Sequence, residues 1–420
     1  MYDLYLKIAT EIKHFFQNDL HDLPLFLVGK VLRVEVKIPQ LEPLNWLARQ
    51  DSVVKTYWDD REGLFTMAGV GAIDILAGDE PIDYQTVFEL LRLNLSPLFP
   101  VRYYGGIGFS QDHQIDPSWE LFGNYRFVIP RFELLRQRIG DYDAYETYFA
   151  CNFRLDLSID PPVRQEQELD QILSELARLN LTELTIKDYH QPELPSLIDR
   201  SDSPNLRDWH RNLDSVLTKF TDLNLDKVVL ARKSTLTFAE PLQAQSILLA
   251  LRSPNPLSYH FCFQINPTTA FIGTSPERLY YRQNRCFKTE ALAGTRHRGR
   301  SSQIDRELSD NLRNSPKDLH EHQLVVQNLQ GILAELCESV AIDRQSKILK
   351  LNKVQHLYTQ CQGILKPDIT DADLLLKLHP TPAVGGFPRE QALQMIHQLE
   401  PFERGWYAAP VGNPPTAGVG

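Results

Sequence analysis

Reactive side chains cluster in residues 269–296, at the ends of two expected strands. Residues 269–272 and 277–282 are predicted to be strands joined by a turn through Gly273, Ser275 and Pro276. Glu277 is then expected where a turn enters a strand. Residues 291–295 are predicted to form a strand that ends in a turn at Gly294, where a missing Cβ lets the main chain approach an anion. The segment predicts the floor of a small-molecule pocket, or otherwise an ordinary meander with Glu277 in solvent.

Two further segments carry residues suited to acid–base chemistry and cation binding. Lys227 opens the apolar run 228–231, expected within one strand over 227–238, where partial burial favours a neutral amine. Glu321 lies one turn beyond Asp318 on a helix expected from a Ser315 cap to about residue 340. Oxygen ligands of this kind suit Mg²⁺. Zinc is disfavoured, because the histidines at 320 and 322 are two residues apart and point to different faces.

The chain contains several short sequence motifs whose order and spacing match those of one enzyme family. They are 273–279 (GTSPERL), 289–296 (TEALAGTR), 227–232 (KVVLAR), 317–322 (KDLHEH), 356–357 (HL), 379–386 (HPTPAVGG) and 404–407 (RGWY). In this order they resemble the chorismate-utilising enzymes, and among them most the isochorismate synthases. The resemblance implies an α/β (α+β) fold like that of anthranilate synthase component I. That fold is a single large domain of stacked antiparallel β-sheets surrounded by helices, with the pocket between the sheets.

The resemblance also implies chemical roles for the residues in these motifs. Isomerising chorismate requires a base to activate water, an acid to protonate the departing hydroxyl, and groups that hold two carboxylates. By resemblance the base is Lys227, the acid is Glu277, and Glu321 is a ligand of Mg²⁺ that bridges to a substrate carboxylate. The implied substrate-binding residues are Gly294 and Thr295 through their amides, together with His356 and Tyr407. Structural alternatives are a surface lysine, a core histidine and an interior tyrosine.

Differences among the relatives favour water as the nucleophile. Anthranilate-forming relatives have glutamine at the position of Lys227, and aminodeoxychorismate-forming relatives often have lysine at the position of Ala293 and threonine near Ala383. The leading prediction is therefore an Mg²⁺-dependent isochorismate synthase of menaquinone or phylloquinone biosynthesis, with a siderophore or salicylate route left open. Salicylate synthase, which goes on to eliminate pyruvate, is the alternative enzyme. A degenerate, non-catalytic chorismate-binding protein is the alternative from another class.

Composition supports a globular protein and argues against several partners. The 420 residues are 42% hydrophobic and 23% charged, and 44 basic against 54 acidic residues give a net charge of −10. An acidic chain without a basic run is a poor nucleic-acid binder. Five scattered cysteines predict free thiols in a reducing cytoplasm, and charges appear too early for a secretory signal. No apolar run is long enough to span a bilayer. Monomer and dimer both remain open.

The order of expected elements places the chemistry in the second half of the chain. Residues 3–17 and 82–95 are predicted helices, and 33–38 alternates as a half-buried strand. Glycines 105, 106 and 108 are expected to be structural, because no helix pattern follows them. The convincing linker-like segments are 190–195 and 201–204. We predict that residues 1–200 form the N-terminal part of the fold and 201–420 the chorismate-binding catalytic part, truncated at its C-terminus.

The expected truncation rests on the resemblance. After residues 407–412 the relatives continue with a strand, a Gly-rich loop and a helix, whereas residues 413–420 (NPPTAGVG) end this chain. The segment is implied to hold a second Mg²⁺-ligating glutamate and an arginine and lysine that contact substrate. We therefore expect a fragment or frameshifted reading with weak or no activity, because one carboxylate cannot replace a full inner shell.

Overall fold

The structure is a computed structural model that describes most of the chain. The described residues are 2–27, 29–110, 116–140, 144–154, 161–182, 194–220 and 225–414. Most of the first predicted linker, 190–195, and the last six residues lie outside them. All strand pairs in the described part of the chain are antiparallel.

The largest sheet has seven strands. In spatial order they are β1 (Val31–Ile38), β8 (Ala144–Arg154), β7 (Phe132–Ile139), β3 (Phe65–Val70), β2 (Lys55–Asp59), β12 (Tyr259–Asn266) and β13 (Thr269–Ser275). The predicted alternation in β1 is confirmed, since Val34, Val36 and Ile38 are buried while Glu35 and Lys37 are exposed. Because β12 and β13 come from the second half of the chain, this sheet joins both predicted parts.

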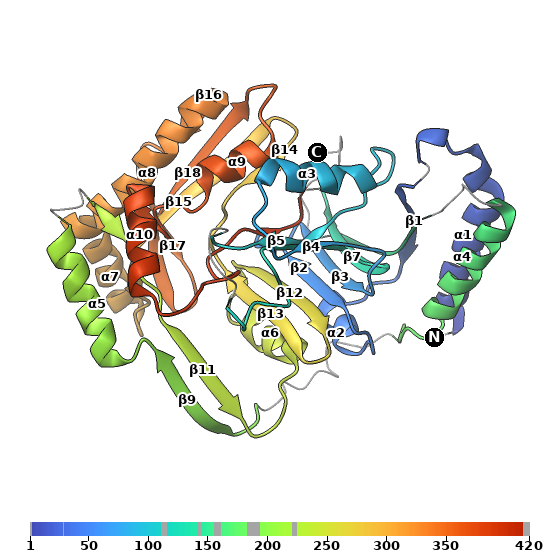
Figure 1. Ribbon diagram of the computed structural model, residues 1–420, viewed down its shortest axis with the longest axis horizontal. Coiled ribbons are helices and arrows are strands. Elements are labelled where there is room, and N and C mark those ends of the chain that lie inside the picture. The colour runs from blue at the N-terminus through green and yellow to red at the C-terminus, as the bar shows by residue number, and fades with distance from the viewer. Residues whose placement is uncertain are drawn as a thin grey trace.

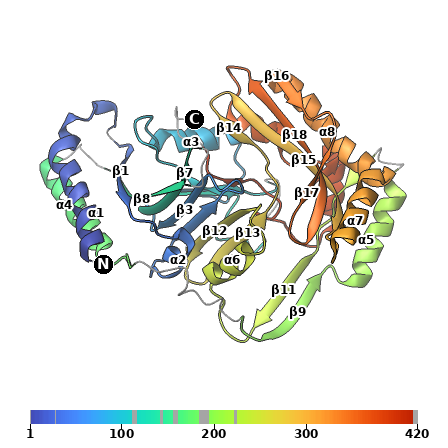
Figure 2. The ribbon, with the colours of Figure 1, turned by 180° about the vertical axis from the view of Figure 1, so that it is seen from behind.

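Helices cover this sheet and one of its ends. They are α1 (Tyr2–His14), α2 (Pro43–Ala48), α3 (Tyr84–Asn94), α4 (Pro161–Leu176) and α6 (Ala244–Arg252). Helices α1 and α4 lie side by side at one end of the molecule (Figures 1 and 2). The predicted helices over 3–17 and 82–95 are therefore present, although α1 continues as a π-helical turn over Phe15–Asp19.

A second sheet carries most of the predicted site. Its strands are β14 (Tyr281–Gln283), β15 (Cys286–His297), β18 (Val354–Leu365) and β16 (Cys337–Ile342), and β17 (Lys347–Lys350) also pairs with β18. The helices beside it are α5 (Leu206–Lys219), α7 (Ser302–Asn314), α8 (Pro316–Leu336), α9 (Asp371–Leu378) and α10 (Arg389–Leu399). Helix α8 packs on β15 and β18 (Figure 1), and its buried stripe includes Val325, Leu329 and Leu333.

Three sequence-based expectations about these elements were wrong in detail. Helix α8 ends at Leu336 and not near 340, because the next residues pair with β18 as β16, which leaves Val340 exposed. The strand expected over 227–238 is two short strands, β10 (Lys227–Val228) and β11 (Lys233–Phe238), which pair with different partners. Glu277 precedes β14 in a loop, so it does not lie within a strand.

That loop has a clear structural reason. Strand β13 ends in the seven-stranded sheet and β14 begins in the second sheet, so residues 276–280 cross from one sheet to the other. Leu279 and Tyr280 anchor the crossing by packing against apolar clusters of both sides. The Tyr280 hydroxyl also donates to Asp371 at 3.1 Å. The crossing therefore holds Glu277 between the sheets.

Smaller sheets complete the framework. A four-stranded sheet contains β20 (Val411–Gly412), β5 (Tyr104–Ile107), β6 (Tyr125–Ile129) and β4 (Asp74–Gly78). Two pairs are β10 with β19 (Gly386–Phe387), and β11 with β9 (Leu197–Ser203). The structural role predicted for Gly105 is confirmed, because a Cβ there would lie 1.9 Å from the Arg126 carbonyl oxygen. No described helix has both the length and the apolar character needed to cross a membrane.

Trp406 joins the segment before β20 to the core. It is 1% exposed, packs with Phe122 and Phe263, and donates its indole N–H to the Gly123 carbonyl at 3.1 Å. Its neighbour Tyr407 is 56% exposed. Adjacent aromatic residues therefore have opposite environments.

This contrast predicts different stability effects. We expect Trp406→Ala to lower the free energy of unfolding by about 3–5 kcal/mol, because it empties a packed site and leaves a buried carbonyl without its donor. The control Tyr407→Ala should change it by no more than about 0.5 kcal/mol. Urea unfolding followed by tryptophan and far-UV signals measures both, and equal losses for the two variants would contradict the assignment.

Candidate active site

Lys227 is fixed at the start of β10 by its strand partner. Lys227 pairs with Phe387 and Val228 pairs with Gly386. Gly386 has φ of +142°, and a Cβ there would lie 2.2 Å from the Lys227 carbonyl oxygen, so the close approach of the two strands requires glycine. The Lys227 side chain is 11% exposed, and its Nζ lies 3.0 Å from a carboxylate oxygen of Glu321. Two predicted site residues are thus in direct contact.

Glu277 faces the same region from the loop that crosses between the sheets. Burial and, next, the neighbouring Glu290 carboxylate raise the pKa of the Glu277 carboxyl to about 7, against the opposing influence of Lys227 and the Thr381 hydroxyl. The residue keeps part of its surface accessible, yet the surrounding protein disfavours its charge. Near neutral pH a substantial fraction of Glu277 therefore carries a proton that it can donate.

Glu321 is the available carboxylate on the first turns of α8. Its side chain is 34% exposed and bonded to Lys227. Asp318 is not available in the same way, because Arg296 holds its two oxygens at 3.2 and 2.6 Å. The expected capping box is half formed: Ser315 accepts from the Asp318 amide at 3.4 Å, while the Asp318 carboxylate turns to the arginine.

These residues fit a magnesium ion only as a site completed by other oxygens. Within the described ranges, no group of three or more histidine, cysteine, aspartate or glutamate side chains is arranged to hold a metal. Mg²⁺ commonly keeps several waters and takes one or two carboxylates together with oxygens of the substrate. Glu321, partly exposed and beside Lys227, matches that pattern of one protein carboxylate.

A β-bulge brings Gly294, Thr295 and His356 together. The register of β15 against β18 shifts between Ala293 and Thr295, and Gly294 has φ of +76°. Thr295 then pairs with His356, and the Thr295 hydroxyl lies 3.0 Å from the His356 ring Nδ1. Burial lowers the pKa of His356. A Cβ at Gly294 would lie 3.2 Å from the Asp318 Cβ, so the bulge sits under the start of α8.

Tyr407 is set apart from the other predicted residues, whereas His322, which was not predicted as a site residue, lies near the Lys227–Glu321 pair. The His322 Nε2 lies 2.8 Å from the Thr359 hydroxyl of β18, and the pKa of His322, lowered mainly by burial, also responds to Glu321 and Lys227. Tyr407 is exposed, and no hydrogen bond or ion pair between its side chain and the other predicted groups is found in the described chain. The structure therefore gathers six of the seven predicted residues around β15 and α8.

An open pocket lies beside this cluster. Its volume is about 220 Å³, and it is lined by Asn328, Ile332, Lys377, Pro380, Pro382, Gly386, Phe387 and Arg389. None of the seven predicted residues lines it. It contacts the strand that pairs with Lys227, so it lies next to the candidate site without containing the reactive groups.

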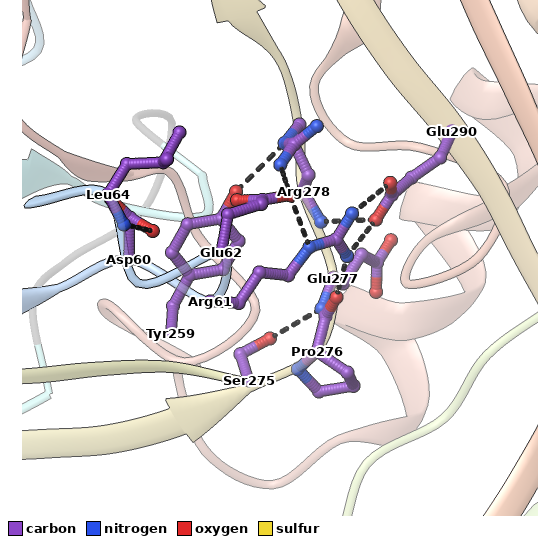
Figure 3. Close-up of polar contacts among 10 residues, drawn as sticks. All are labelled: Asp60, Arg61, Glu62, Leu64, Tyr259, Ser275, Pro276, Glu277, Arg278 and Glu290. Carbon is purple, nitrogen blue, oxygen red and sulfur yellow. Dashed lines mark hydrogen bonds and ion pairs between the residues drawn. The ribbon is translucent and has the colours of Figure 1, made fainter. Parts of the chain in front are cut away.

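Sequence analysis did not identify the charged residues around Glu277. Arg61, in the turn between β2 and β3, donates two hydrogen bonds of 2.5 Å to Glu290 of β15, and Arg278 approaches from the same loop as Glu277 (Figure 3). Glu290 belongs to the motif TEALAGTR, but its burial on a strand is visible only in the structure. The signal for Glu290 in the sequence was a glutamate directly before the apolar run 291–293.

The arrangement combines a lysine, a proton-bearing carboxyl and a second carboxylate in one region. A positioned amine and a carboxyl with a pKa near 7 are suited to paired general base and general acid catalysis. The free carboxylate of Glu321 is suited to a hard cation. Such a set can exchange one hydroxyl group for another on a bound ring.

Comparison with known proteins gives consistent matches. Residues 28–420 match the family model described as chorismate binding enzyme. The chain is 32% identical over 363 residues to isochorismate synthase, chloroplastic, of Catharanthus roseus, covering 86% of this chain and 60% of that protein. It is 30% identical over 415 residues to isochorismate synthase MenF of Escherichia coli, covering 96% of this chain and 86% of that protein. The chain thus spans less than two thirds of the plant relative's length.

Structural comparison agrees with the sequence comparison. The solved structure of MenF, the menaquinone-specific isochorismate synthase from Escherichia coli, has a TM-score of 0.79 and 25% sequence identity. The match covers 97% of this chain and 87% of that one. The predicted fold of stacked antiparallel sheets and helices is confirmed. Because the family model spans nearly the whole chain and the fold agrees, the protein belongs to the chorismate-binding enzyme family, together with the isochorismate synthases.

Proposed function

We propose that this protein is an isochorismate synthase, which converts chorismate to isochorismate with Mg²⁺. The single observation that carries the proposal is the convergence of Lys227, Glu277 and Glu321 from three separate segments. Lys227 contacts Glu321 at 3.0 Å and acts electrostatically on Glu277. The relatives named isochorismate synthase support this choice among chorismate-binding enzymes.

The proposed roles follow from the state of each group. Lys227, once it has released its proton, takes a proton from a water molecule, and that water attacks one ring carbon. Glu277 donates its proton to the hydroxyl that departs from another ring carbon. The net change adds one water and releases one, so no oxidant or reductant is needed. Lys227 and Glu277 exchange protons with solvent to complete the cycle.

The other groups bind and orient the substrate in this proposal. The amides of Gly294 and Thr295 are oriented by the bulge and are suited to a carboxylate, and the Thr295 hydroxyl contacts His356. Tyr407 remains a proposed substrate contact from the exposed end of the fold. Glu321 would hold Mg²⁺, and the bound ion would supply positive charge for the carboxylates of the substrate.

The first test removes the proposed base and acid. We expect Lys227→Ala and Glu277→Gln each to lower kcat for chorismate by about 10²–10⁴-fold, because each removes one proton-transfer group. Chorismate loss and isochorismate formation are followed by chromatography. Lys233→Ala is the matched control for the lysine, since Lys233 also opens a strand and pairs with a carboxylate, Asp116, at 3.3 Å.

The same assay separates the competing functions. Release of pyruvate with salicylate would identify a salicylate synthase. Binding of chorismate by calorimetry without any product would identify a chorismate-binding protein. Wild-type turnover that survives Lys227→Ala would contradict the role of this lysine.

The second test uses pH. Glu277 must be protonated to act as an acid, and its pKa of about 7 means that the active form is lost as pH rises through neutrality. We expect kcat/KM, which reports the free enzyme, to fall on the alkaline side with a midpoint near that value, since one proton is lost from the donor. In Glu277→Gln the residual activity should lack this alkaline fall. A profile of kcat/KM against pH measures it, and an unchanged alkaline fall in that variant would assign the transition to another group.

The third test concerns the metal. We expect chelation by EDTA to abolish turnover and Mg²⁺ to restore it. Glu321→Gln should raise the Mg²⁺ concentration for half-maximal activity by about 10-fold or more, because a neutral amide is a weaker ligand for a hard cation. Glu335→Gln is the control, because Glu335 is on the same helix and pairs with Lys377 at 2.6 Å. Titration calorimetry with chorismate present gives a second readout, and equal Mg²⁺ affinity in both variants would exclude Glu321 as a ligand.

A further inference from the structure

Arg61 and Glu290 form an ion pair that bridges the two large sheets. Arg61 lies in the turn between β2 and β3 of the seven-stranded sheet, and Glu290 lies on β15 of the second sheet. The guanidinium makes two parallel hydrogen bonds of 2.5 Å to the carboxylate. The side chains are 10% and 1% exposed. Such a bidentate, desolvated pair has a well-defined geometry.

The pair also holds the main chain on both sides of Glu277. Arg61 Nη1 donates to the Pro276 carbonyl, which precedes Glu277, and the Arg278 amide, which follows it, donates to Glu290 Oε1 at 3.1 Å. The Glu277 amide itself donates to the Ser275 hydroxyl at 3.2 Å. Figure 3 shows the Glu277 and Glu290 side chains on the same side of the Arg61 guanidinium. The crossing loop is therefore tied at consecutive residues.

We propose that Arg61 and Glu290 are positioning residues, a clamp that fixes the Glu277 carboxyl at the reaction centre and keeps it in the proton-donating form. This inference rests on the proposed function of Glu277 as general acid. Neither residue needs to touch the substrate. Their action runs through the loop backbone and through the charge of Glu290.

The charge of Glu290 is the second part of the argument. Two adjacent carboxyl groups cannot both ionise easily in a poorly solvated site. The guanidinium of Arg61 and the Arg278 amide satisfy Glu290, whereas the contacts of Glu277 with Lys227 and Thr381 are weaker opposing influences. Proximity to Glu290 is the largest contribution, after burial, to the raised pKa of Glu277. Of the two adjacent carboxyl groups, Glu277 is therefore the one that is favoured to carry a proton.

Other charged and titratable groups face this centre from neighbouring elements. Arg278 of the same loop is occupied by Glu62 and by the Tyr259 hydroxyl, which it approaches at 2.8 Å. Tyr358 of β18 interacts with Glu290, and burial raises the pKa of that tyrosine. Lys227 of β10 faces Glu277. Among these groups, Glu290 is the one whose charge raises the pKa of Glu277 directly.

The clamp is tested by titrating Glu277 itself. Protein labelled with ¹³C at the glutamate side-chain carboxyl gives a carbon resonance for Glu277, identified by its loss in Glu277→Gln. We expect Glu290→Gln to lower the pKa of Glu277 by about one unit or more, because a neutral amide replaces the adjacent negative charge. The alkaline fall of kcat/KM should shift to lower pH by the same amount.

Glu133→Gln is the matched control. Glu133 is also 1% exposed and also receives two hydrogen bonds from one arginine, Arg33, at 2.9 and 3.3 Å, but it lies on β7, away from the Glu277 loop. A general loss of stability would appear in both variants. A shift in the pKa of Glu277 should appear only in Glu290→Gln. Circular dichroism and melting temperature establish that each variant is folded.

A second variant tests the geometric part and does not depend on Glu290→Gln folding. Arg61→Lys retains the positive charge but cannot bond both Glu290 oxygens and the Pro276 carbonyl at once. We expect kcat to fall by about 10-fold or more with little change in KM, since the acid is displaced while binding groups remain. Glu290→Asp should keep the pKa of Glu277 close to that of the wild type, because the charge is retained.

The outcomes separate the clamp from the proposed function. A lowered pKa of Glu277 in Glu290→Gln supports the clamp even if chorismate is not converted, in which case the proposed function alone fails. An unchanged pKa of Glu277 in folded Glu290→Gln overturns the clamp. If that variant does not fold, full kcat in Arg61→Lys overturns it, and a fall in kcat with KM retained supports it.

Discussion

Whether a carboxyl group keeps its proton near neutral pH depends on which of the charged groups around it are paired with one another. In this protein Arg61 is committed to Glu290, and the adjacent Glu277 is left without an arginine of its own. Without the nearby charge of Glu290 the pKa of Glu277 would be lower, and less of the proposed proton donor would carry its proton near neutral pH. The pairing of Arg61 with Glu290, and not with Glu277, is therefore the condition on which the proposed acid catalysis by Glu277 depends.

That condition is met only when the two large sheets are in place. Arg61 comes from the seven-stranded sheet, Glu290 from the second sheet, and Glu277 from the loop that crosses between them. Leu279 and Tyr280 secure the crossing by packing against apolar clusters from both sides. Burial of apolar surface therefore sets the relative position of charges that are far apart in sequence. Packing and electrostatics are coupled at this loop.

The sequence predicts the long helices and strands better than it predicts where they end and how they pair. The alternation in β1 and the periodicity of α3 and α8 were read correctly because each of these elements buries one face and leaves polar residues on the other. The end of α8 at Leu336 and the break between β10 and β11 depend on pairing with β18, β19 and β9, and distant pairing leaves little local signal. The sequence motifs identified Lys227, Glu277 and Glu321 as candidate site residues. They could not identify Arg61, whose partner is 229 residues away.

The charge balance of the site gives a physical reason for the proposed cation. With Glu277 protonated, Lys227 is matched by Glu321 and Arg61 by Glu290. Nearby arginines are matched as well, Arg278 by Glu62 and Arg296 by Asp318. These ion pairs leave no positive charge of their own to balance a substrate with two carboxylates. Desolvating such a substrate without a counter-charge is costly. The proposed Mg²⁺ at Glu321 would offset that charge, and it would also compete with Lys227 for the same carboxylate. Mg²⁺ binding at Glu321 would therefore also release the Lys227 side chain from this contact.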